Sequence, residues 1–250
     1  LPVAWLLVPC LLFLTCWSLL VLAVAVHQEP VAYPRIAEFL ACLHRRRISS
    51  FLVTNGQFPD ALRALPRVTQ LYVSCDGAVR DDLEAVGRPL FKDFWERYVE
   101  SLNILRERPE RTVCRLTLMR GRNMEQLQAW ADLLQRASPD FVELKGVTLA
   151  AIFEKNGLNT RSMPTHLEVK EFAEALVELL PDYGLACEHE HSVSVLLTSR
   201  RFLGREGWTT WIDFEHFADI WDSEHVSALD YALATPAWAL YGSPPEGFAP

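Results

Sequence analysis

Polar side chains stand at the ends of two neighbouring apolar runs in this 250-residue sequence. Residues 51–53 lead into Thr54 and Asn55, and a second run leads into Ser74 and Asp76. Hydroxyl, amide and carboxylate groups at such places either hold the polar edge of a small ligand or turn the chain as it leaves a strand. Spacing alone leaves both interpretations open.

Charged side chains also fall inside two later runs that are otherwise apolar. Arg115 and Thr117 share one face of the first run, and Glu143 and Lys145 share one face of the second. A buried charge is costly unless it is paired or faces a ligand, so these residues indicate a polar cleft. The alternative is an internal salt bridge, for example between Arg115 and Glu143.

The run from Cys187 to Ser192 carries the highest density of reactive groups. In an extended strand, Cys187, His189 and His191 would share one face, and the two glutamates would lie on the other. Zinc could bind such a set, but ligands about 6 to 7 Å apart along a strand suit a tetrahedral site poorly, so no metal ligand is predicted. Acid–base catalysis or hydrogen bonding to a substrate are the other interpretations, beside a purely structural polar strand.

Short β-branched or aromatic runs alternate with longer amphipathic stretches, which is typical of βα units around a parallel sheet. Strands are expected at 21–26, 50–54, 70–75, 112–119, 140–147 and 185–189. Helices are expected at 35–46, 91–105, 124–134 and 166–180. In this architecture functional groups gather at the carboxyl ends of the strands, where the polar residues above are found.

Composition narrows the possible classes of protein. The chain is 50% hydrophobic, enough for one substantial core, and its net charge of −8 disfavours a general nucleic-acid coat protein. Its six cysteines lack the dense spacing of a disulfide-linked secreted domain, so a reducing compartment is expected. We therefore expect a cytoplasmic protein with one main domain.

Residues 1–26 contain no charged side chain, and this length could cross a membrane as a helix. Pro2 and Pro9 interrupt the stretch, and no basic segment precedes it. A buried strand at 21–26 after an apolar segment of doubtful status is the main interpretation. A protein anchored in the membrane through residues 1–20 is the alternative.

Many separate short segments of the sequence, in the same order, resemble the C-terminal part of the tRNA 4-demethylwyosine synthases. The similarity extends from about Gln28 to the end of the chain. Its clearest segments are 51–55, 70–74, 88–95, 115–118, 139–141, 145–148, 180–183, 187–192, 211–213 and 235–242.

This resemblance implies an α/β fold, a partial (β/α) radical-SAM-type barrel that is incomplete at its N-terminal end. It implies tRNA wybutosine biosynthesis, in which N1-methylguanosine of phenylalanine tRNA condenses with pyruvate. In such enzymes a [4Fe–4S] cluster held by three cysteines cleaves S-adenosyl-L-methionine to a radical. The reaction is that of a carbon–carbon lyase.

The resemblance also implies roles for the strand-end residues. Glu29 would occupy the glutamate position of the family's Gly-Glu-Pro loop. The predicted cofactor-binding set is Glu29, Thr54, Asn55, Ser74, Asp76 and Arg115. Lys145, Glu188 and His189 are predicted as catalytic residues, facing the cleft near the tRNA base or pyruvate.

Several positions depart from the family's pattern. The Cys-x3-Cys-x2-Cys motif is missing, Gln28 replaces the loop glycine, and residues 149–153 are apolar where relatives carry a polar loop. The FMN-binding flavodoxin-like domain of eukaryotic members is also absent from this sequence. The prediction is therefore a family member that is incomplete or inactive as written, and whether it is an enzyme stays uncertain.

Four regions are predicted. They are an apolar segment at 1–20, the barrel at 21–148, a wybutosine-synthesis region at 149–205 and a C-terminal extension at 206–250. A barrel that binds tRNA or a partner without catalysis is an alternative function, with residues 44–47 as candidate phosphate contacts.

Overall fold

A single curved sheet organises the chain. The structure is a computed structural model that describes residues 21–24, 29–148 and 159–243. Seven strands are hydrogen-bonded in the order β1-β2-β3-β4-β5-β7-β6. Their bounds are β1 Val21–Val24, β2 Ser49–Thr54, β3 Gln70–Cys75, β4 Arg111–Leu118, β5 Phe141–Gly146, β7 Ser194–Ser199 and β6 Tyr183–His189.

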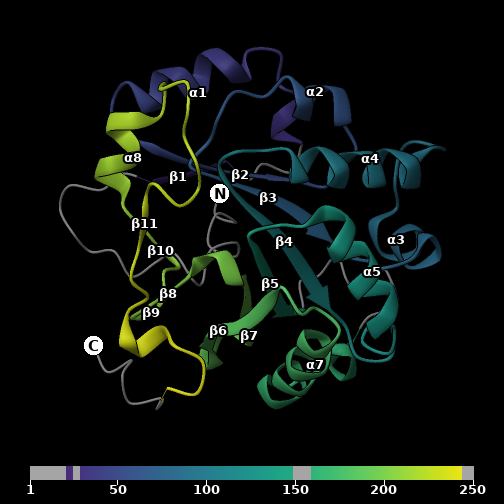
Figure 1. The fold of residues 1–250 in the computed structure, drawn as a ribbon. Coiled ribbons are helices and arrows are strands. Elements are labelled where there is room, and N and C mark those ends of the chain that lie inside the picture. Colours follow the sequence, from purple (N-terminus) through teal and green to yellow (C-terminus); the bar gives the residue numbers. More distant parts are fainter. Residues whose placement is uncertain (1–20, 25–28, 149–158, 244–250) are drawn as a thin grey trace.

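Helices connect the strands and cover one side of the sheet (Figure 1). Their bounds are α1 Ile36–His44, α2 Pro59–Arg63, α3 Arg80–Gly87, α4 Phe94–Arg106, α5 Leu127–Ala137 and α7 His166–Glu178. The largest core cluster lies between these helices and alternate strand residues such as Leu71, Leu116 and Leu144, none of which is exposed. The regular apolar alternation of the strands therefore buries their outer face under the helices.

The inner face of the sheet is covered by the C-terminal segment (Figure 1). This segment contains α8 Phe214–Ile220 and the short strands β8 Leu203–Gly204, β9 Gly207–Trp208, β10 Trp211–Ile212 and β11 Ala232–Leu233. Phe51 packs with Phe217 and Tyr231, and Phe141 packs with Phe202. The amino-terminal half of the inner face is thus mainly apolar, with the buried Arg111 guanidinium donating to Gln70 at 2.9 Å within it, and the candidate polar groups lie nearer the carboxyl ends of the strands.

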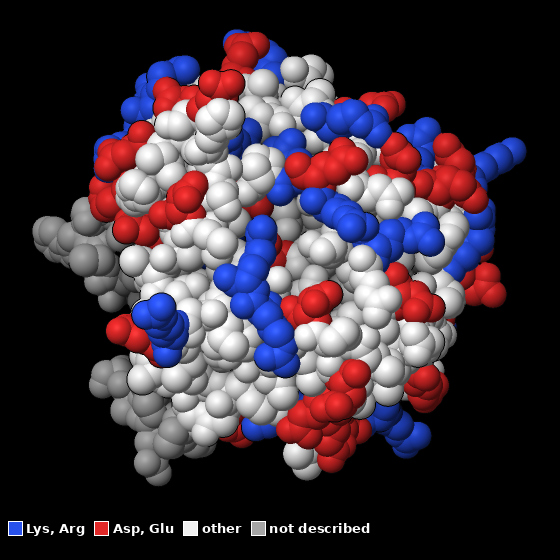
Figure 2. Space-filling model, viewed as in Figure 1, with Lys and Arg blue, Asp and Glu red and all other residues white. Residues whose placement is uncertain are grey.

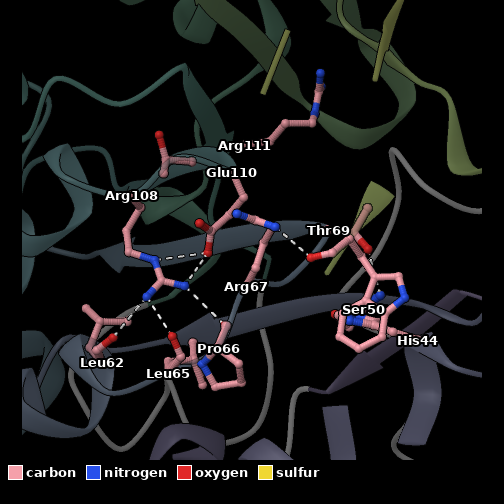
Figure 3. A network of polar contacts seen from close by, with 12 residues as sticks. His44, Ser50, Leu62, Leu65, Pro66, Arg67, Thr69, Arg108, Glu110 and Arg111 are labelled. Atoms are coloured by element: carbon pink, nitrogen blue, oxygen red, sulfur yellow. Dashed lines mark hydrogen bonds and ion pairs between the residues drawn. The ribbon is translucent and has the colours of Figure 1, made fainter. Parts of the chain in front are cut away.

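Polar contacts close the opposite, amino end of the barrel (Figure 3). The Arg108 guanidinium donates to the Leu65 carbonyl at 2.7 Å and pairs with the fully buried Glu110 carboxylate at 2.5 Å. Arg67 reaches across to the C-terminal segment and donates to the carbonyl oxygens of Trp221 at 2.6 Å and Ser223 at 2.9 Å. These bonds tie the loop before β3 to the segment that fills the barrel.

The predicted strands 50–54, 70–75, 112–119, 140–147 and 185–189 are confirmed to within about two residues, and four long helices lie where expected. The strand at 21–26 is present over Val21–Val24. The predicted parallel sheet is confirmed for β1 to β5, whereas β7 runs antiparallel to both β5 and β6, so the sheet as a whole is mixed. β7, α2, α3 and α8 were not predicted.

Within the described residues, no helix combines the length and the apolar character needed to cross a membrane. The apolar residues 1–20 lie outside the described part, and so do the apolar residues 149–153.

Candidate active site at the carboxyl ends of the strands

A row of four side chains crosses the inner face of the sheet at its carboxyl edge. Thr117 of β4 is paired with Lys145 of β5, Lys145 with Ser194 of β7, and Ser194 with His189 of β6. Paired residues of neighbouring strands point to the same face, so the row is continuous. The antiparallel β7 therefore brings two predicted catalytic residues, Lys145 and His189, into one line.

Lys145 is a buried amine, with 9% of the residue exposed. Its Nζ donates to the backbone carbonyl of Ser192 at 2.6 Å. Lysine is rarely buried to this extent, because its charged form loses hydration. A buried amine at the mouth of a barrel is the usual nucleophile for a ketone or aldehyde.

His189 ends β6 and closes a tight turn with Ser192. The backbone amide of Ser192 donates to Nδ1 of His189 at 3.2 Å, and the Ser192 hydroxyl contacts the same nitrogen. Burial lowers the pKa of His189 below its usual value, and the nearby charges of His191 and Lys145 add to the effect. The imidazole is therefore neutral near pH 7 and suited to proton transfer beside the amine.

A second polar row lies one step deeper in the barrel. Ser74 of β3 is paired with Arg115 of β4, and Arg115 with Glu143 of β5. Nε of Arg115 lies 3.7 Å from a Glu143 carboxylate oxygen, so the internal salt bridge considered from the sequence is present. Burial raises the pKa of Asp76, and hydrogen bonding to Thr117 and the charge of Arg115 partly oppose this rise. Ser74, Asp76 and Arg115 therefore line one continuous polar wall.

Glu29, Thr54 and Asn55 come together at the carboxyl end of β2. The Glu29 carboxylate accepts from the Thr54 hydroxyl at 2.5 Å and from the Asn55 backbone amide at 2.8 Å. Burial raises the pKa of Glu29 despite these two bonds. Glu29 and Asn55 also line a pocket of ≈ 890 Å³ whose other walls include Phe58 and Phe91. A fixed carboxylate beside an apolar pocket suits a ligand with an amino group and an uncharged ring.

Glu188 lies apart from the other predicted catalytic residues. It is paired with Val195, on the side of the sheet that α7 covers, while His189 points inward. Its carboxylate lies 2.7 Å from Nζ of Lys170 and 3.8 Å from Nε2 of His166, both on α7. The structure therefore does not bring Glu188 together with Lys145 and His189.

The cysteines of the described residues are scattered. Cys42 lies on α1, Cys75 and Cys114 are buried under the helices, and Cys187 lies on the inner face near Thr210. No group of three His, Cys, Asp or Glu side chains in the described part could hold a metal ion. The cysteines described here do not fit a [4Fe–4S] cluster, and Cys10 and Cys16 lie outside the described residues.

The arginine-rich end of α1 lies far from this site. His44 is buried and donates to or accepts from the Ser50 hydroxyl at 2.7 Å. Arg47 pairs with Glu215 and Asp219, each at 2.7 Å. The chain then enters β2 from its amino end, so residues 44–47 lie at the opposite end of the barrel from Lys145.

Three participants were missed from the sequence. Ser194 was overlooked because β7 was not predicted, and the Ser192 carbonyl is a backbone group that no side-chain pattern reveals. Thr117 was noted beside Arg115 but not placed in the site. Its strand position, two residues beyond Arg115 on the same face, was the available signal.

The chain resembles known proteins over most of its length. Residues 136–200 match a family model described as wyosine base formation. The S-adenosyl-L-methionine-dependent tRNA 4-demethylwyosine synthase TYW1 of Xenopus laevis is 48% identical over 235 residues, which is 91% of this chain and 32% of that protein. The corresponding synthase of Arabidopsis thaliana is 46% identical over 231 residues, or 91% of this chain and 36% of that protein.

This chain is a member of the tRNA 4-demethylwyosine synthase family. Solved structures support the same assignment. A structure of TYW1 with a lysine–pyruvate adduct bound superimposes with a TM-score of 0.65 at 30% identity, covering 73% of this chain and 57% of that one. A crystal structure of archaeal TYW1 gives a TM-score of 0.60 at 30% identity, covering 72% and 57%. The α/β fold with its largely parallel sheet is thus the fold of the synthase family, and the chain spans about a third of the length of the curated relatives named above.

Proposed function

We propose that this chain is the pyruvate-activating barrel of a tRNA 4-demethylwyosine synthase, with Lys145 as the residue that binds pyruvate covalently. The observation that carries the proposal is the buried Lys145 amine at the carboxyl edge of the sheet. Among the described lysines, Lys92 is exposed and Lys170 pairs with Glu188, so Lys145 is best suited to attack a ketone. The lysine–pyruvate adduct in a related TYW1 structure supports this choice.

Imine formation is the chemistry assigned to the row of Thr117, Lys145, Ser194 and His189. After losing a proton, Nζ of Lys145 attacks the ketone carbon of pyruvate and gives a carbinolamine, which loses water to form the C=N bond. His189 shuttles the proton from nitrogen to the departing hydroxyl, since its lowered pKa leaves it neutral near pH 7. The Arg115 guanidinium lies one step deeper and attracts the pyruvate carboxylate. Glu188 acts through α7 and contributes to the support of β6.

S-Adenosyl-L-methionine would be held by Glu29, Thr54 and Asn55, together with Ser74, Asp76 and Arg115. The raised pKa values of Glu29 and Asp76 support a site that awaits a cationic or hydrogen-bonding ligand. When bound, this cofactor supplies the radical that takes hydrogen from the methylated base. The [4Fe–4S] cluster that such chemistry requires finds no ligand set in the described residues, so we derive no step through it.

Phenylalanine tRNA would approach the carboxyl edge, and a substrate of this kind implies a cytoplasmic protein. Acidic and basic side chains alternate over the face seen in Figure 2, in keeping with the net charge of −8. The tRNA phosphates must therefore be met by local groups, and two exposed arginines directly follow β4 at the correct edge: Arg122, and Arg120, which pairs with Glu168. N1-methylguanosine would enter the barrel between them and Lys145.

The test is reductive trapping of pyruvate on the intact chain. Incubation with pyruvate followed by sodium borohydride should reduce the imine and leave one stable added group on the peptide that contains Lys145. The Lys145→Arg variant should lose this product, because a guanidinium does not form the imine. Lys170→Arg is the matched control and should retain it. Equal trapping in wild type and Lys145→Arg would overturn the proposal.

A further inference from the structure

The turn between β6 and β7 contains a strained residue. Val193 follows η3 Glu190–Ser192 and adopts the left-handed conformation, with φ 52° and ψ 53°. Four non-glycine residues of the described chain have positive φ, and among them Val193 alone is β-branched. Such residues resist this conformation because Cβ crowds the following carbonyl, and surrounding structure must hold them there.

The residue that holds Val193 is Gly146, the direct neighbour of Lys145. The Gly146 amide donates to the Val193 carbonyl at 2.9 Å. A Cβ on Gly146 would lie 2.8 Å from Cγ1 of Val193 and 3.1 Å from Cγ of Pro164. Real Cβ atoms do not come so close, so the Val193 side chain occupies the space that any larger residue at 146 would need.

The same turn sets the position of the Ser192 carbonyl. Val193 donates its amide to the Glu190 carbonyl at 2.8 Å, and Ser192 donates its amide to His189 at 3.2 Å. With both ends of the turn fixed, the Ser192 carbonyl oxygen faces Nζ of Lys145 at 2.6 Å. The consecutive carbonyl groups of Ser192 and Val193 therefore link the turn to Lys145 and Gly146, respectively.

We propose that the turn formed by Val193 and seated on Gly146 is a positioning device for the Lys145 amine. A neutral amine has two N–H bonds and one lone pair, and donating one hydrogen to Ser192 fixes the rotation of the nitrogen. The lone pair is then restricted to the two remaining tetrahedral positions, within the inner row that Lys145 shares with His189. Val193 and Gly146 are positioning residues, and the inference rests on the proposed function of Lys145.

A turn needed only to reverse the chain would not require valine. Glycine and asparagine adopt the left-handed conformation with little strain, so either would connect β6 and β7. Valine adds a branched side chain that fills the space over Gly146 and prevents the turn from shifting along β5. The packing of Val193 over Gly146 therefore holds the strained turn and secures the placement of the Ser192 carbonyl.

A double-mutant cycle with Gly146→Ala and Val193→Gly tests the device. The readout is the limiting rate of borohydride-trapped adduct at saturating pyruvate, with the half-saturating pyruvate concentration and thermal unfolding measured in parallel. Gly146→Ala should slow the limiting rate about tenfold or more, since small displacements of a reacting group cost this much. Val193→Gly should slow it about threefold, and in that background Gly146→Ala should slow it less than in the wild type, because the 2.8 Å contact with Cγ1 is gone and only Pro164 Cγ at 3.1 Å remains close.

Gly204→Ala serves as the control, since its added Cβ would only reach the Gly207 carbonyl at 3.6 Å. It should leave the limiting rate unchanged. Additive effects of the two substitutions, or rate losses that only follow the fraction of unfolded protein, would overturn the inference. Val193→Gly removes a strained side chain and should fold, so this arm remains readable if Gly146→Ala is unstable.

A second measurement makes the two proposals separable. Acetic anhydride labels lysine amines without pyruvate, and mass spectrometry gives the labelling rate at Lys145. Val193→Gly should raise this rate about threefold or more, because the amine is released from Ser192. If wild type traps no pyruvate, the proposed function fails, and an unchanged labelling rate at Lys145 would separately refute the positioning role.

Discussion

Asp76 is a carboxyl group that the barrel interior makes costly to ionise. Burial raises its pKa above the usual 3.8, whereas the charge of Arg115 offsets only part of the effect. As pH rises above 3.8, unfolded Asp76 loses its proton while folded Asp76 retains it, so this group makes the free energy of unfolding fall with pH. A cationic or hydrogen-bonding ligand would offset the cost of ionising Asp76, so this residue is suited to bind such a ligand.

Asp76→Asn should therefore be more stable than wild type at neutral pH, and this advantage should shrink as pH falls toward 3.8. Urea unfolding over a pH series measures the difference. Asp93→Asn is the control of opposite sign, because Arg97 lowers the pKa of Asp93 and its removal should cost stability as pH rises. A difference between Asp76→Asn and wild type that does not change with pH would contradict the argument.

The sequence identified most residues of the polar wall, but not the face of the sheet to which each side chain points. Ser74, Asp76 and Arg115 lie together because strand periodicity is two and carboxyl ends of parallel strands meet. Glu188 and His189 are neighbours in one strand, so they cannot both point inward, and the structure turns Glu188 toward Lys170. Backbone groups such as the Ser192 carbonyl leave no trace in residue type.

Among the elements, α7 shows how a helix that carries no predicted nucleophile still supports the site. Thr165 caps its first turn by accepting from the Glu168 amide at 3.3 Å, and the Glu168 carboxylate accepts from the Thr165 amide at 2.7 Å. The Arg120 side chain and the Thr165 backbone lower the pKa of Glu168 to about 2. This reciprocal cap fixes the helix that packs behind β5, β6 and β7.

Thr165→Ala should lower the free energy of unfolding by about 1 kcal/mol, the usual effect of losing such a cap. Thr165→Ser keeps the hydroxyl and should retain most of the stability. Chemical denaturation of both variants measures the change. Because the pKa of Glu168 is lowered, its contribution is present above 4.5 and is lost as pH falls toward about 2. Equal stability of the Ala and Ser variants would argue against the cap.

The elements that the sequence missed have physical reasons. β2 to β5 were predicted because strands buried on both faces read as apolar runs between turn residues. β7 follows the His-rich run without glycine, proline or asparagine, because the reversal is made by Val193 in a conformation that valine rarely adopts. α3 carries Asp81, Asp82 and Glu84 and buries little more than Leu83, so its apolar periodicity is weak.

For the molecule as a whole, the inner face of the sheet is divided by depth. The C-terminal segment packs Phe202, Phe217 and Tyr231 into the amino half, around the buried Arg111–Gln70 pair, and the two polar rows of the candidate site occupy the carboxyl half. Tyr231 donates to the Thr69 carbonyl and accepts from the Arg111 amide, each at 3.0 Å, which ties this segment to β3 and β4. The distant end of the chain thus forms the floor on which the candidate site stands.

Arg67→Met tests how strongly this floor is held. It removes the two bonds to the Trp221 and Ser223 carbonyls, and the free energy of unfolding should fall by about 1 to 3 kcal/mol. Hydrogen exchange should accelerate after α8. Arg63→Met is the matched control, since the exposed Arg63 pairs with the surface residues Asp60 and Glu100. Comparable losses in both variants would contradict a clamp at Arg67.

The close fit of Val193 on Gly146 has a consequence for how sequences of this family diverge. A side chain gained at position 146 has no room unless position 193 becomes smaller, and a glycine at 193 removes the closest contact that a Cβ at 146 would make. Two positions far apart in the chain are therefore expected to change together over evolutionary time. We therefore expect positions 146 and 193 to covary across homologous sequences, because the two side chains compete for the same space in each molecule.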